Sequence, residues 1–419
     1  MKWRMFICAI CFLIGGCSLN IPLEDQFSDP DAITDVLSAR SLLASAYKAM
    51  PQQIFQLSVL SDDFCPSQHL NKDMSLQGLY NWREVEMTEL AGTLWAGYYA
   101  VIAEVNALLA RIDAVVTLDE TEKLEKMRIV CEAKALKSWC YFDLLRLFAP
   151  RYEGNENKDG IILKKRVELD FLPRSSVKEC VTEIRTLLNE ARNVDNTQKN
   201  VYWLSDKAVA YLQVELELYA GNYPAVLELT KDLETEYPES VLGADVYKYL
   251  WSSENSDARI FGKYQLEQIY MDIRFDTFEK GDYLVLSQNV DYEEEDIRKE
   301  WSEIPFVMPD AKNVRLLGKY NKMNRDKVAS KYVNVARAAG MWLMRVEALA
   351  RSGKEGDAVA LANRMLKQRG ATEWSTNIAG NELISKILIE RQKEYVGEGI
   401  RFFDMKRCGL SAIRYGTYG

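Results

Sequence analysis

Histidine is nearly missing from this sequence, and its scarcity removes whole classes of chemistry. The one histidine is His69, which lies in the polar segment SQHLNKD. A Ser-His-Asp or Cys-His catalytic arrangement would have to use that residue, and a metal site with two His ligands is impossible. Polar surroundings are typical of a surface histidine, so we expect His69 to be a surface residue rather than a catalytic one. We predict no catalytic residue, no metal site and no cofactor.

Paired cysteine motifs and clustered basic residues are also missing. Among the eight cysteines, no Cys-x-x-Cys pair occurs outside the first 17 residues, so no zinc or redox motif stands out. The five cysteines after Cys17 are an odd number, and buried unpaired thiols on helices are their expected state. Acidic residues outnumber basic ones, 62 to 53, for a formal net charge of −9. Without a basic stripe, the chain is a poor candidate for binding nucleic acid.

Long apolar runs are absent except at the start of the chain. Met5 to Ile14 form an unbroken apolar run of ten residues, whereas a transmembrane helix needs about 20. The run follows Lys2 and Arg4, which is the pattern of a secretory signal. It ends in two glycines and Cys17, and small residues before a cysteine resemble a bacterial lipobox.

This leader predicts an anchored protein. We expect a lipoprotein signal peptide at residues 1–16, acylation of Cys17, and an extended polar tether at residues 17–31. Several acyl chains, each contributing ~0.8 kcal/mol per buried methylene, would make a stable anchor. The alternative is an ordinary signal peptide with an incidental cysteine. We expect no later segment of membrane-spanning length.

The rest of the chain is mostly helical in pattern. Apolar residues recur with the helical period over about 32–50, 92–148, 173–238 and 328–410. Residues 120–148 predict one long helix that Pro150 stops, and Ser175 or Ser176 is the expected N-cap of the next helix, which runs to about Ala191.

Two stretches, 206–238 and 335–370, resemble each other. Each predicts a helix, a glycine turn at Gly221 or Gly353, and a second helix with a small residue near its start. A helix-turn-helix unit of about 34 residues is the tetratricopeptide layout. The expected fold class is therefore mostly all-α, a tetratricopeptide-like helical-repeat α/α superhelix, in a single domain spanning residues 32–419.

Two regions, about 53–91 and 240–330, predict an irregular, loop-rich lobe with short strands around 258–266 and 282–290. Ligand-binding residues often lie in such segments beside a rigid scaffold. Flat aromatic rings suit the apolar faces of a sugar, and amide or carboxyl groups suit its hydroxyls. Trp95, Trp139 and Trp342 lie on helical apolar faces and are expected in the core. The candidate ligand-binding residues are Asp62, Tyr80, Asn81, Trp82, Trp251, Tyr270, Tyr283, Asn289 and Trp301.

A cluster of charges near the C-terminus has two interpretations. On a helix, Arg391 would face Glu394 and Arg401 would face Asp404 at i+3. Two close carboxylates also occur in glycosidases, but interleaved arginines would keep them ionised, which is the wrong state for a general acid. We therefore predict a structural network that docks the last helix. Its members are Glu390, Arg391, Glu394, Glu398, Arg401, Asp404 and Arg407.

Three segments together resemble the SusD/RagB family of outer-membrane nutrient-binding lipoproteins. The first is CEAKALKSWCYFDLLRLFAP at 131–150, followed by PRSSVKECVTEIRTLLNEA at 173–191. The second is MWLMRVEALARSGKEGDAVALANRMLKQRG at 341–370, and the third is ILIERQKEYVGEGIRFFDMKRCGL at 387–410. With the leader, these segments are spread over nearly the whole length of the chain and follow the family's order.

The resemblance implies a cell-surface protein, lipid-anchored in the outer membrane of a Gram-negative bacterium. It implies capture of oligosaccharides or peptides and their delivery to a SusC-like TonB-dependent β-barrel transporter, without catalysis. Two other functions remain open from the residues. One is a surface glycoside hydrolase, supported by the many carboxylates, and the other is a helical-repeat scaffold that binds proteins.

Overall fold

A computed structural model of the chain describes residues 33–66, 74–168, 171–192, 200–252, 255–264, 284–308, 311–320 and 332–414. Helices dominate these ranges, which confirms the mostly α fold class. The predicted signal peptide, Cys17, the tether, His69, Tyr270 and Tyr283 lie outside the described residues.

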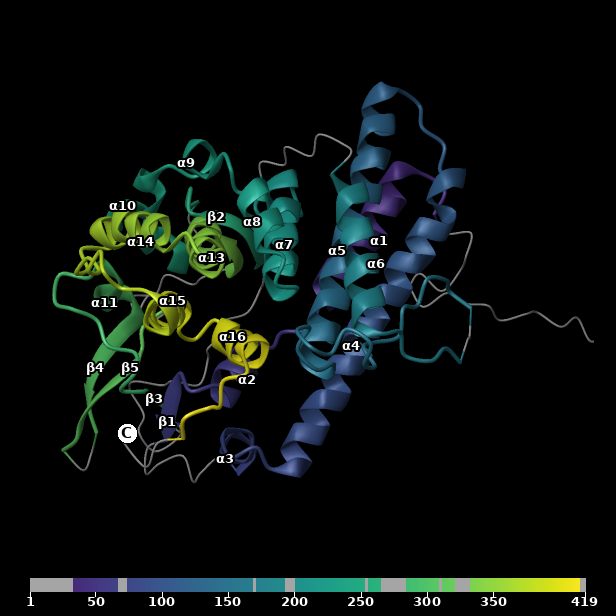
Figure 1. Cartoon of the computed structure of the whole chain (residues 1–419). Helices are drawn as coiled ribbons and strands as arrows, with labels where there is room; N and C mark the ends of the chain where they lie inside the picture. Colours follow the sequence, from purple (N-terminus) through teal and green to yellow (C-terminus); the bar gives the residue numbers. More distant parts are fainter. Residues whose placement is uncertain are drawn as a thin grey trace, which may run out of the picture.

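Helices from the first half of the chain run side by side on one side of the molecule (Figure 1). They are α1 (Val36–Ala49), α4 (Glu84–Arg111), α5 (Glu120–Phe148) and α6 (Val177–Ala191). The short helix η3 (Ile112–Ala114) leads from α4 towards α5. Within this group, Arg40 of α1 is joined to α5 through ion pairs with Glu125 and Glu132 at 2.5 and 2.9 Å.

Capping residues fix the ends of these helices. The Asp119 side chain accepts a hydrogen bond from the backbone N–H of Glu122 at the start of α5. Ser176 and Glu179 form a reciprocal capping box at the start of α6. The N-cap is therefore Ser176, one of the two serines that the sequence predicted. The helix α5 ends at Phe148, before Pro150, as predicted.

The two predicted helix pairs are present in the second half. The first is α7 (Asp206–Tyr219) with α8 (Tyr223–Leu229), and the second is α13 (Ala338–Arg351) with α14 (Glu355–Arg369). Gly221 and Gly353 make the turns with φ of 69° and 75°. A side chain would be unfavourable at these positive φ values, which explains the glycine in each turn.

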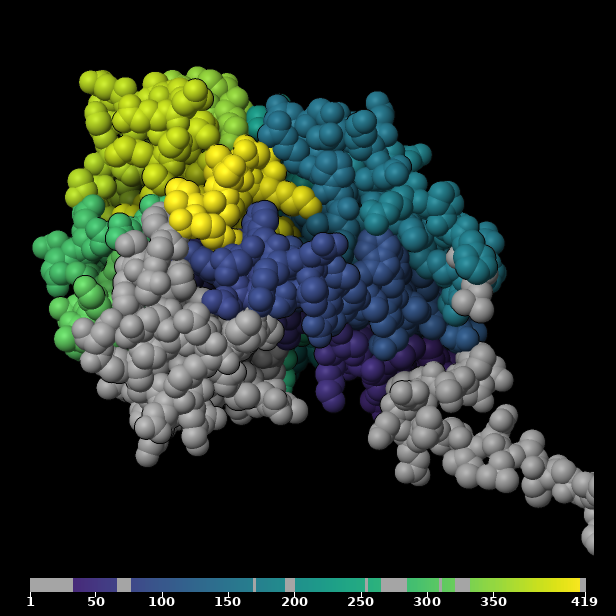
Figure 2. Space-filling model, turned by 90° about the horizontal axis from the view of Figure 1, so that it is seen from below, coloured from purple at the N-terminus to yellow at the C-terminus, as the bar shows by residue number. Residues whose placement is uncertain are grey.

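The last helices close the structure against its beginning. They are α15 (Gly380–Tyr395) and α16 (Ile400–Cys408). The helix α15 packs on α13, and α16 packs on α2 (Ile54–Leu60). Seen from below, the yellow C-terminal residues lie directly against the blue residues of the N-terminal half (Figure 2).

Short strands form two small sheets beside the helices. An antiparallel sheet has the order β1-β3-β5-β4, and a second sheet pairs β2 with β6. The strands are β1 (Phe64–Pro66), β2 (Arg259–Tyr264), β3 (Leu284–Leu286), β4 (Glu303–Val307), β5 (Asn313–Leu317) and β6 (Tyr332–Arg337). Around them lie short helices: α3 (Met74–Tyr80), α9 (Leu233–Glu236), η4 (Glu239–Leu242), α10 (Ala244–Tyr247), η5 (Lys248–Trp251) and α11 (Ile297–Ser302).

The boundaries of the irregular lobe differ from the sequence prediction. Residues 53–91 were expected to be irregular, yet α2, α3 and the first turns of α4 lie there. The helices α2 and α3 are short and are stabilised by packing on α16 and α4 rather than by a long periodic pattern. Residues 335–337 were expected to be helical but belong to β6, which pairs with β2. The strands expected near 258–266 and 282–290 are β2 and β3.

The helix α4 also differs from the expectation that no later segment reaches membrane-spanning length. Among the described residues, Glu84–Ala114 is long and apolar enough to cross a membrane by length and composition alone. Its buried side chains, including Tyr98, Val101 and Ile102, lie in the main core beside α1 and α5. The exposed face carries small residues such as Ala96 and Ala100, which raise the hydropathy without forming a core face.

Candidate functional site

Buried ion pairs tie the last two helices to α13. Arg391 of α15 donates from Nε and Nη2 to the carboxylate of Asp404 on α16, at 2.8 and 3.1 Å. Arg407 donates to Asp404 at 2.9 Å and to both carboxylate oxygens of Glu347 on α13, at 2.7 and 2.6 Å. Glu347 is 0% exposed and Asp404 is 2% exposed. These contacts hold three helices in one arrangement.

A second charged centre surrounds Glu394, which is 0% exposed. Arg298, Arg337 and Arg369 approach its carboxylate at 3.4, 2.6 and 2.8 Å. Burial by itself would raise the pKa of Glu394, but these arginines outweigh it and lower the pKa to about 2. A carboxylate that stays ionised near neutral pH cannot act as a general acid.

The ion pairs are not those that the helical spacing suggested. Arg391 pairs with Asp404 rather than with Glu394 at i+3, and Arg401 pairs with Asp62 at 2.7 and 3.0 Å rather than with Asp404. Glu390 pairs with Arg298 of α11. The reason is tertiary, since buried partners on other elements reach these side chains and satisfy more of their hydrogen bonds.

Asp63 follows Asp62 in the chain and has an unusual environment. Burial raises the pKa of Asp63 to about 7, and its carboxyl accepts a hydrogen bond from the backbone N–H of Gly397 at 3.2 Å. A carboxyl group with a raised pKa beside a second carboxyl group is a pattern found in glycosidases. Here, however, Asp62 and Asp63 are both 0% exposed, so a polysaccharide has no access to them in this structure.

Metal chemistry receives no support from the described ranges. Within them, no group of three or more His, Cys, Asp or Glu side chains is arranged to hold a metal ion. The five cysteines of these ranges are free thiols, four of them buried.

The predicted ligand-binding residues do not gather at one place. Asp62, Tyr80 and Trp251 are buried, with 0%, 3% and 1% of their surface exposed. Asn81 and Trp82 are exposed after α3, whereas Asn289 and Trp301 are half-buried near β3 and in α11.

Trp251 belongs to a small aromatic core in the irregular lobe. Its ring meets those of Tyr247 and Tyr320 edge to face, with centroids 5.5 and 5.2 Å apart. Lys319 and Arg337 lie 4.8 and 5.6 Å from the ring centroid. Its faces therefore contact protein rather than solvent.

Trp82 is held at the surface with one face partly open. It is 48% exposed and has a positive φ of 54°. Its indole N–H donates to the carbonyl of Leu60 at 3.0 Å, and the Arg414 guanidinium lies 5.5 Å from its ring centroid. A fixed, exposed indole can stack on an apolar sugar face.

A second aromatic surface joins three segments that are distant in the sequence. We call Tyr202, Tyr264 and Tyr332 the tyrosine platform. The Tyr202 and Tyr264 rings are 5.9 Å apart, and the Tyr264 and Tyr332 rings are 6.0 Å apart. Tyr264 is 44% exposed, and the other two are half-buried. Trp203 extends the cluster inward, 5.5 Å from Tyr202.

The small β2–β6 sheet builds this platform. Tyr264 ends β2 and lies opposite Tyr332, which begins β6. The backbone N–H of Gly262 donates to the carbonyl of Val201 at 2.9 Å, which brings the segment before α7 to the same edge. A Cβ at Gly262 would lie 3.0 Å from Arg259 and 3.3 Å from the Tyr332 side chain. The close approach of these segments is thus easiest with glycine.

Two guanidinium groups lie against this aromatic cluster, one at Tyr332 of the platform and the other at Trp203. The Arg259 guanidinium lies 4.8 Å from the Tyr332 ring centroid, and that of Arg40 lies 5.0 Å from the Trp203 centroid. Arg259 is 4% exposed and donates to the side-chain oxygen of Asn334 at 2.8 Å. These contacts restrict how the aromatic rings can turn, and a preorganised surface loses less entropy on binding.

The tyrosine platform was not predicted from the sequence. Tyr202 precedes a predicted helix, and Tyr264 and Tyr332 lie near the ends of predicted segments, where neither a periodic pattern nor a motif distinguishes them. The available signal was the strand predicted at 258–266. Pairing of that strand with residues 332–337 was not visible in the sequence, because strand partners far apart in the chain have no local signature.

Packed helix pairs beside two short sheets define a helical-repeat protein. Sequence comparison agrees with this architecture. Residues 23–214 match a SusD-like family described as "Starch-binding associating with outer membrane". Residues 243–416 match the SusD family. This chain belongs to the SusD family.

Individual relatives are distant in sequence but similar along their whole length. SusD-like protein P38 of Formosa agariphila is 22% identical, over 94% of this chain and 88% of its own. A SusD superfamily protein of Bacteroides thetaiotaomicron superposes with a TM-score of 0.76 at 19% identity, covering 92% of this chain and 91% of its own. A SusD-like carbohydrate binding protein of Bacteroides vulgatus has a TM-score of 0.72 at 18% identity, covering 91% and 85%. At these identities the solved structures establish the fold.

Proposed function

We propose that this protein is a cell-surface nutrient-binding lipoprotein that captures oligosaccharides on the tyrosine platform and passes them, chemically unchanged, to a SusC-like TonB-dependent transporter. The observation that carries the proposal is the row of tyrosines Tyr202, Tyr264 and Tyr332, with neighbouring rings about 6 Å apart and partly exposed. Aromatic faces beside hydroxyl groups match the alternating apolar and polar surface of a sugar.

Family membership supports the same function. The matching family is described as starch-binding and outer-membrane-associated, and a structural neighbour is named a carbohydrate binding protein. The proposed organisation is a signal peptide at 1–16, a lipidated tether at 17–31 beginning with Cys17, and a single SusD-like domain at 32–419. In this proposal the lipid anchor holds the domain at the outer membrane, beside the transporter.

Peptides are the alternative ligands, because tyrosines also bind extended chains through stacking and hydrogen bonds. The hydrolase alternative is disfavoured by the charged network, since the Glu394 carboxylate stays ionised and the Asp63 carboxyl is buried. Trp82, Asn81, Asn289 and Trp301 remain candidates for further ligand contacts, together with Tyr270 and Tyr283 outside the described residues.

The test is binding of purified polysaccharides and oligosaccharides to the wild type and to Tyr264→Ala, measured by affinity electrophoresis and calorimetry. Loss of one stacking ring should weaken binding of a recognised glycan about fivefold or more, because an aromatic contact contributes roughly 1 kcal/mol. Tyr223→Ala is the matched control, since Tyr223 is half-buried on α8, where it contacts Arg351 rather than the platform.

Three outcomes would argue against this function. Equal binding by the wild type and Tyr264→Ala would remove the platform from the site. Saturable binding of peptides with no glycan bound would replace the ligand class. If independently purified batches of the protein all released reducing sugars from a glycan panel, the protein would be a hydrolase instead.

A further inference from the structure

Trp82 occupies a backbone position where glycine is the usual residue. It is the second residue after α3, and its φ of 54° lies in the left-handed region. Its N–H donates to the carbonyl of Leu79 at 3.1 Å, and the N–H of Arg83 donates to that of Gly78 at 2.9 Å. These two bonds end the helix in the Schellman arrangement, in which the left-handed residue is usually glycine because a side chain is strained there. The turn by itself therefore disfavours tryptophan.

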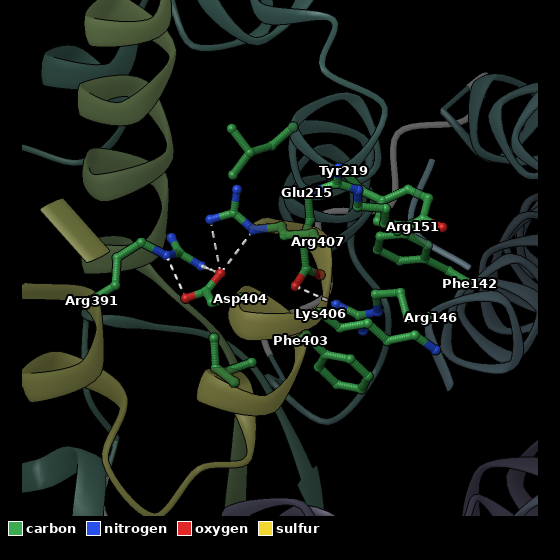
Figure 3. A pocket seen from close by; sticks show the side chains of 12 residues that line it. Phe142, Arg146, Arg151, Glu215, Tyr219, Arg391, Phe403, Asp404, Lys406 and Arg407 are labelled. Atoms are coloured by element: carbon green, nitrogen blue, oxygen red, sulfur yellow. Dashed lines mark hydrogen bonds and ion pairs between the residues drawn. The ribbon is translucent and has the colours of Figure 1, made fainter. Parts of the chain in front are cut away.

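The end of α16 has the usual residue at the same position. Gly409 has a φ of 66°, and the same pair of backbone hydrogen bonds ends the helix there. The helix is fixed to its surroundings by the ion pairs of Arg391 and Arg407 with Asp404 (Figure 3). The residues after Gly409 thus leave α16 from a fixed point, and they lead to Arg414.

The indole of Trp82 is bound to a carbonyl that it shares with Arg414. The Leu60 carbonyl, at the end of α2, accepts hydrogen bonds from Trp82 Nε1 at 3.0 Å and from Arg414 Nη2 at 2.7 Å. Arg414 Nη1 donates to the neighbouring carbonyl of Ser61. Carbonyls at a helix end have no partner within the helix, and arginine side chains can supply one. The two side chains therefore meet at one atom.

The Arg414 guanidinium also contacts two aromatic rings. It lies 4.6 Å from the ring centroid of Tyr80 and 5.5 Å from that of Trp82. A cation is attracted to the face of an aromatic ring. Tyr80 is 3% exposed, whereas Trp82 is 48% exposed. Arg414 thus restrains the indole while nearly half of the Trp82 surface stays open to solvent.

We propose that Arg414 is a positioning residue for ligand binding, which holds the Trp82 indole in the orientation in which its exposed surface stacks on a sugar. Strained backbone positions are found at ligand sites, where the surrounding contacts maintain them. A ring that is already held in place loses less entropy when a ligand binds. The inference rests on the proposed function, because the sugar belongs to the same class of glycan, and it adds a role for a residue of the segment after α16.

The first experiment measures the Trp82 indole in the absence of glycan. The protein is labelled with isotope-enriched tryptophan for nuclear magnetic resonance, and the Trp82 indole N–H signal is assigned by its loss in Trp82→Phe. In Arg414→Ala the signal should shift and its proton should exchange with solvent about fivefold faster, because the guanidinium contact that restrains the ring is lost. Arg414→Lys keeps the charge and should restore part of the protection. Arg414 is exposed, so these substitutions should leave the fold intact.

Arg174→Ala is the matched control. Arg174 is also exposed, donates to the carbonyl of Phe148 at the end of α5, and lies 4.9 Å from the ring centroid of Trp95. Its loss should leave the Trp82 signal as in the wild type. The inference is overturned if Arg414→Ala, shown to be folded by circular dichroism, keeps the wild-type Trp82 signal, or if Arg174→Ala alters that signal equally.

The second experiment connects the position of the ring with binding. Calorimetry with maltoheptaose, cellohexaose and xylohexaose compares the wild type with Trp82→Ala, Arg414→Ala and the double variant. For a glycan that binds, Trp82→Ala should weaken binding about fivefold, since one stacking ring is lost. Arg414→Ala should weaken it about twofold to threefold. The double variant should bind like Trp82→Ala, because Arg414 acts through the ring.

The failure of this inference differs from that of the proposed function. Losses that add up in the double variant, or binding by Trp82→Ala equal to that of the wild type, overturn the role of Arg414. If Tyr264→Ala weakens binding while Trp82→Ala and Arg414→Ala do not, this inference fails and the tyrosine platform stands. A wild-type protein that binds no glycan overturns the proposed function and, with it, the ligand contact at Trp82.

Discussion

Buried carboxyl groups in this protein respond to pH in two opposite ways. The pKa of Glu394 is lowered to about 2 by its arginines, against burial, and the pKa of Glu347 is lowered to about 2 in the same way by Arg407, Arg391 and Arg351. Both groups stabilise the fold at pH values above 4.5, the pKa of a glutamate in the unfolded chain. That contribution is lost as the pH falls towards 2. The pKa of Asp63 is instead raised to about 7.

The raised pKa of Asp63 predicts a second pH dependence of stability, with the opposite sign. Its pKa rises from 3.8 to about 7 on folding, so the folded state holds the proton more tightly and loses stability as the pH rises between these values. Asp63→Asn should flatten this part of the curve, because the amide does not ionise. Urea denaturation of both proteins at pH 5, 6, 7 and 8 measures the difference.

A matched variant checks that the effect belongs to Asp63. Glu234→Gln alters an exposed partner of Arg364 and should change stability by less than about 1 kcal/mol, with the wild-type pH dependence kept. Parallel pH profiles for the wild type and Asp63→Asn would show that Asp63 is not the titrating group.

Helix packing requires glycine at one helical position and does not require it at another. A Cβ on Gly340 of α13 would collide with the hydroxyl groups of Tyr211 and Tyr395, which lie on α7 and α15, 3.3 Å apart. A Cβ on Gly356 of α14 would meet nothing within 4 Å. The two glycines therefore separate the effect of packing from that of helix propensity.

Gly340→Ala should destabilise the protein by about 1–3 kcal/mol, because the added methyl forces apart three packed helices. Gly356→Ala should be neutral or stabilising by up to ~1 kcal/mol, since alanine favours the helical conformation. Denaturation midpoints of the two variants test this contrast. Equal effects of the two substitutions would contradict the packing at Gly340.

The whole molecule is a helical body whose N-terminal and C-terminal halves are locked together. Arg401 of α16 reaches Asp62 beyond α2, and α16 packs on α2, although these elements are separated by most of the chain. The body is proposed to be tethered through Cys17, which lies outside the described residues. Tethering and ligand binding are therefore separable properties.

Replacement of the lipidation site tests the tether. Cys17→Ser should move the protein from the membrane fraction to the soluble fraction of expressing cells, because the acyl chains are lost. The folded body and its ligand binding should be unchanged. Cell fractionation and mass spectrometry of the N-terminal peptide measure the outcome, and a wild-type peptide without acyl groups would refute the anchor.

The sequence by itself determined the elements with strong local signals. The long helix α5 and the capped helix α6 were predicted with their ends, because apolar periodicity, a cap at Ser176 and Pro150 all act within a few residues. The glycine turns of the two helix pairs were predicted for the same reason. These local signals, together with the C-terminal segment, were enough to recognise the family.

Only the tertiary structure decided which distant residues meet. It buried Trp251 in an aromatic core, paired Arg391 with Asp404 and Arg401 with Asp62, and brought Tyr202, Tyr264 and Tyr332 to one edge of a small sheet. Such contacts arise from long-range packing and strand pairing, for which neighbouring residues in the chain carry no pattern. The scaffold is thus encoded locally, whereas the candidate binding surfaces exist only after the chain has folded.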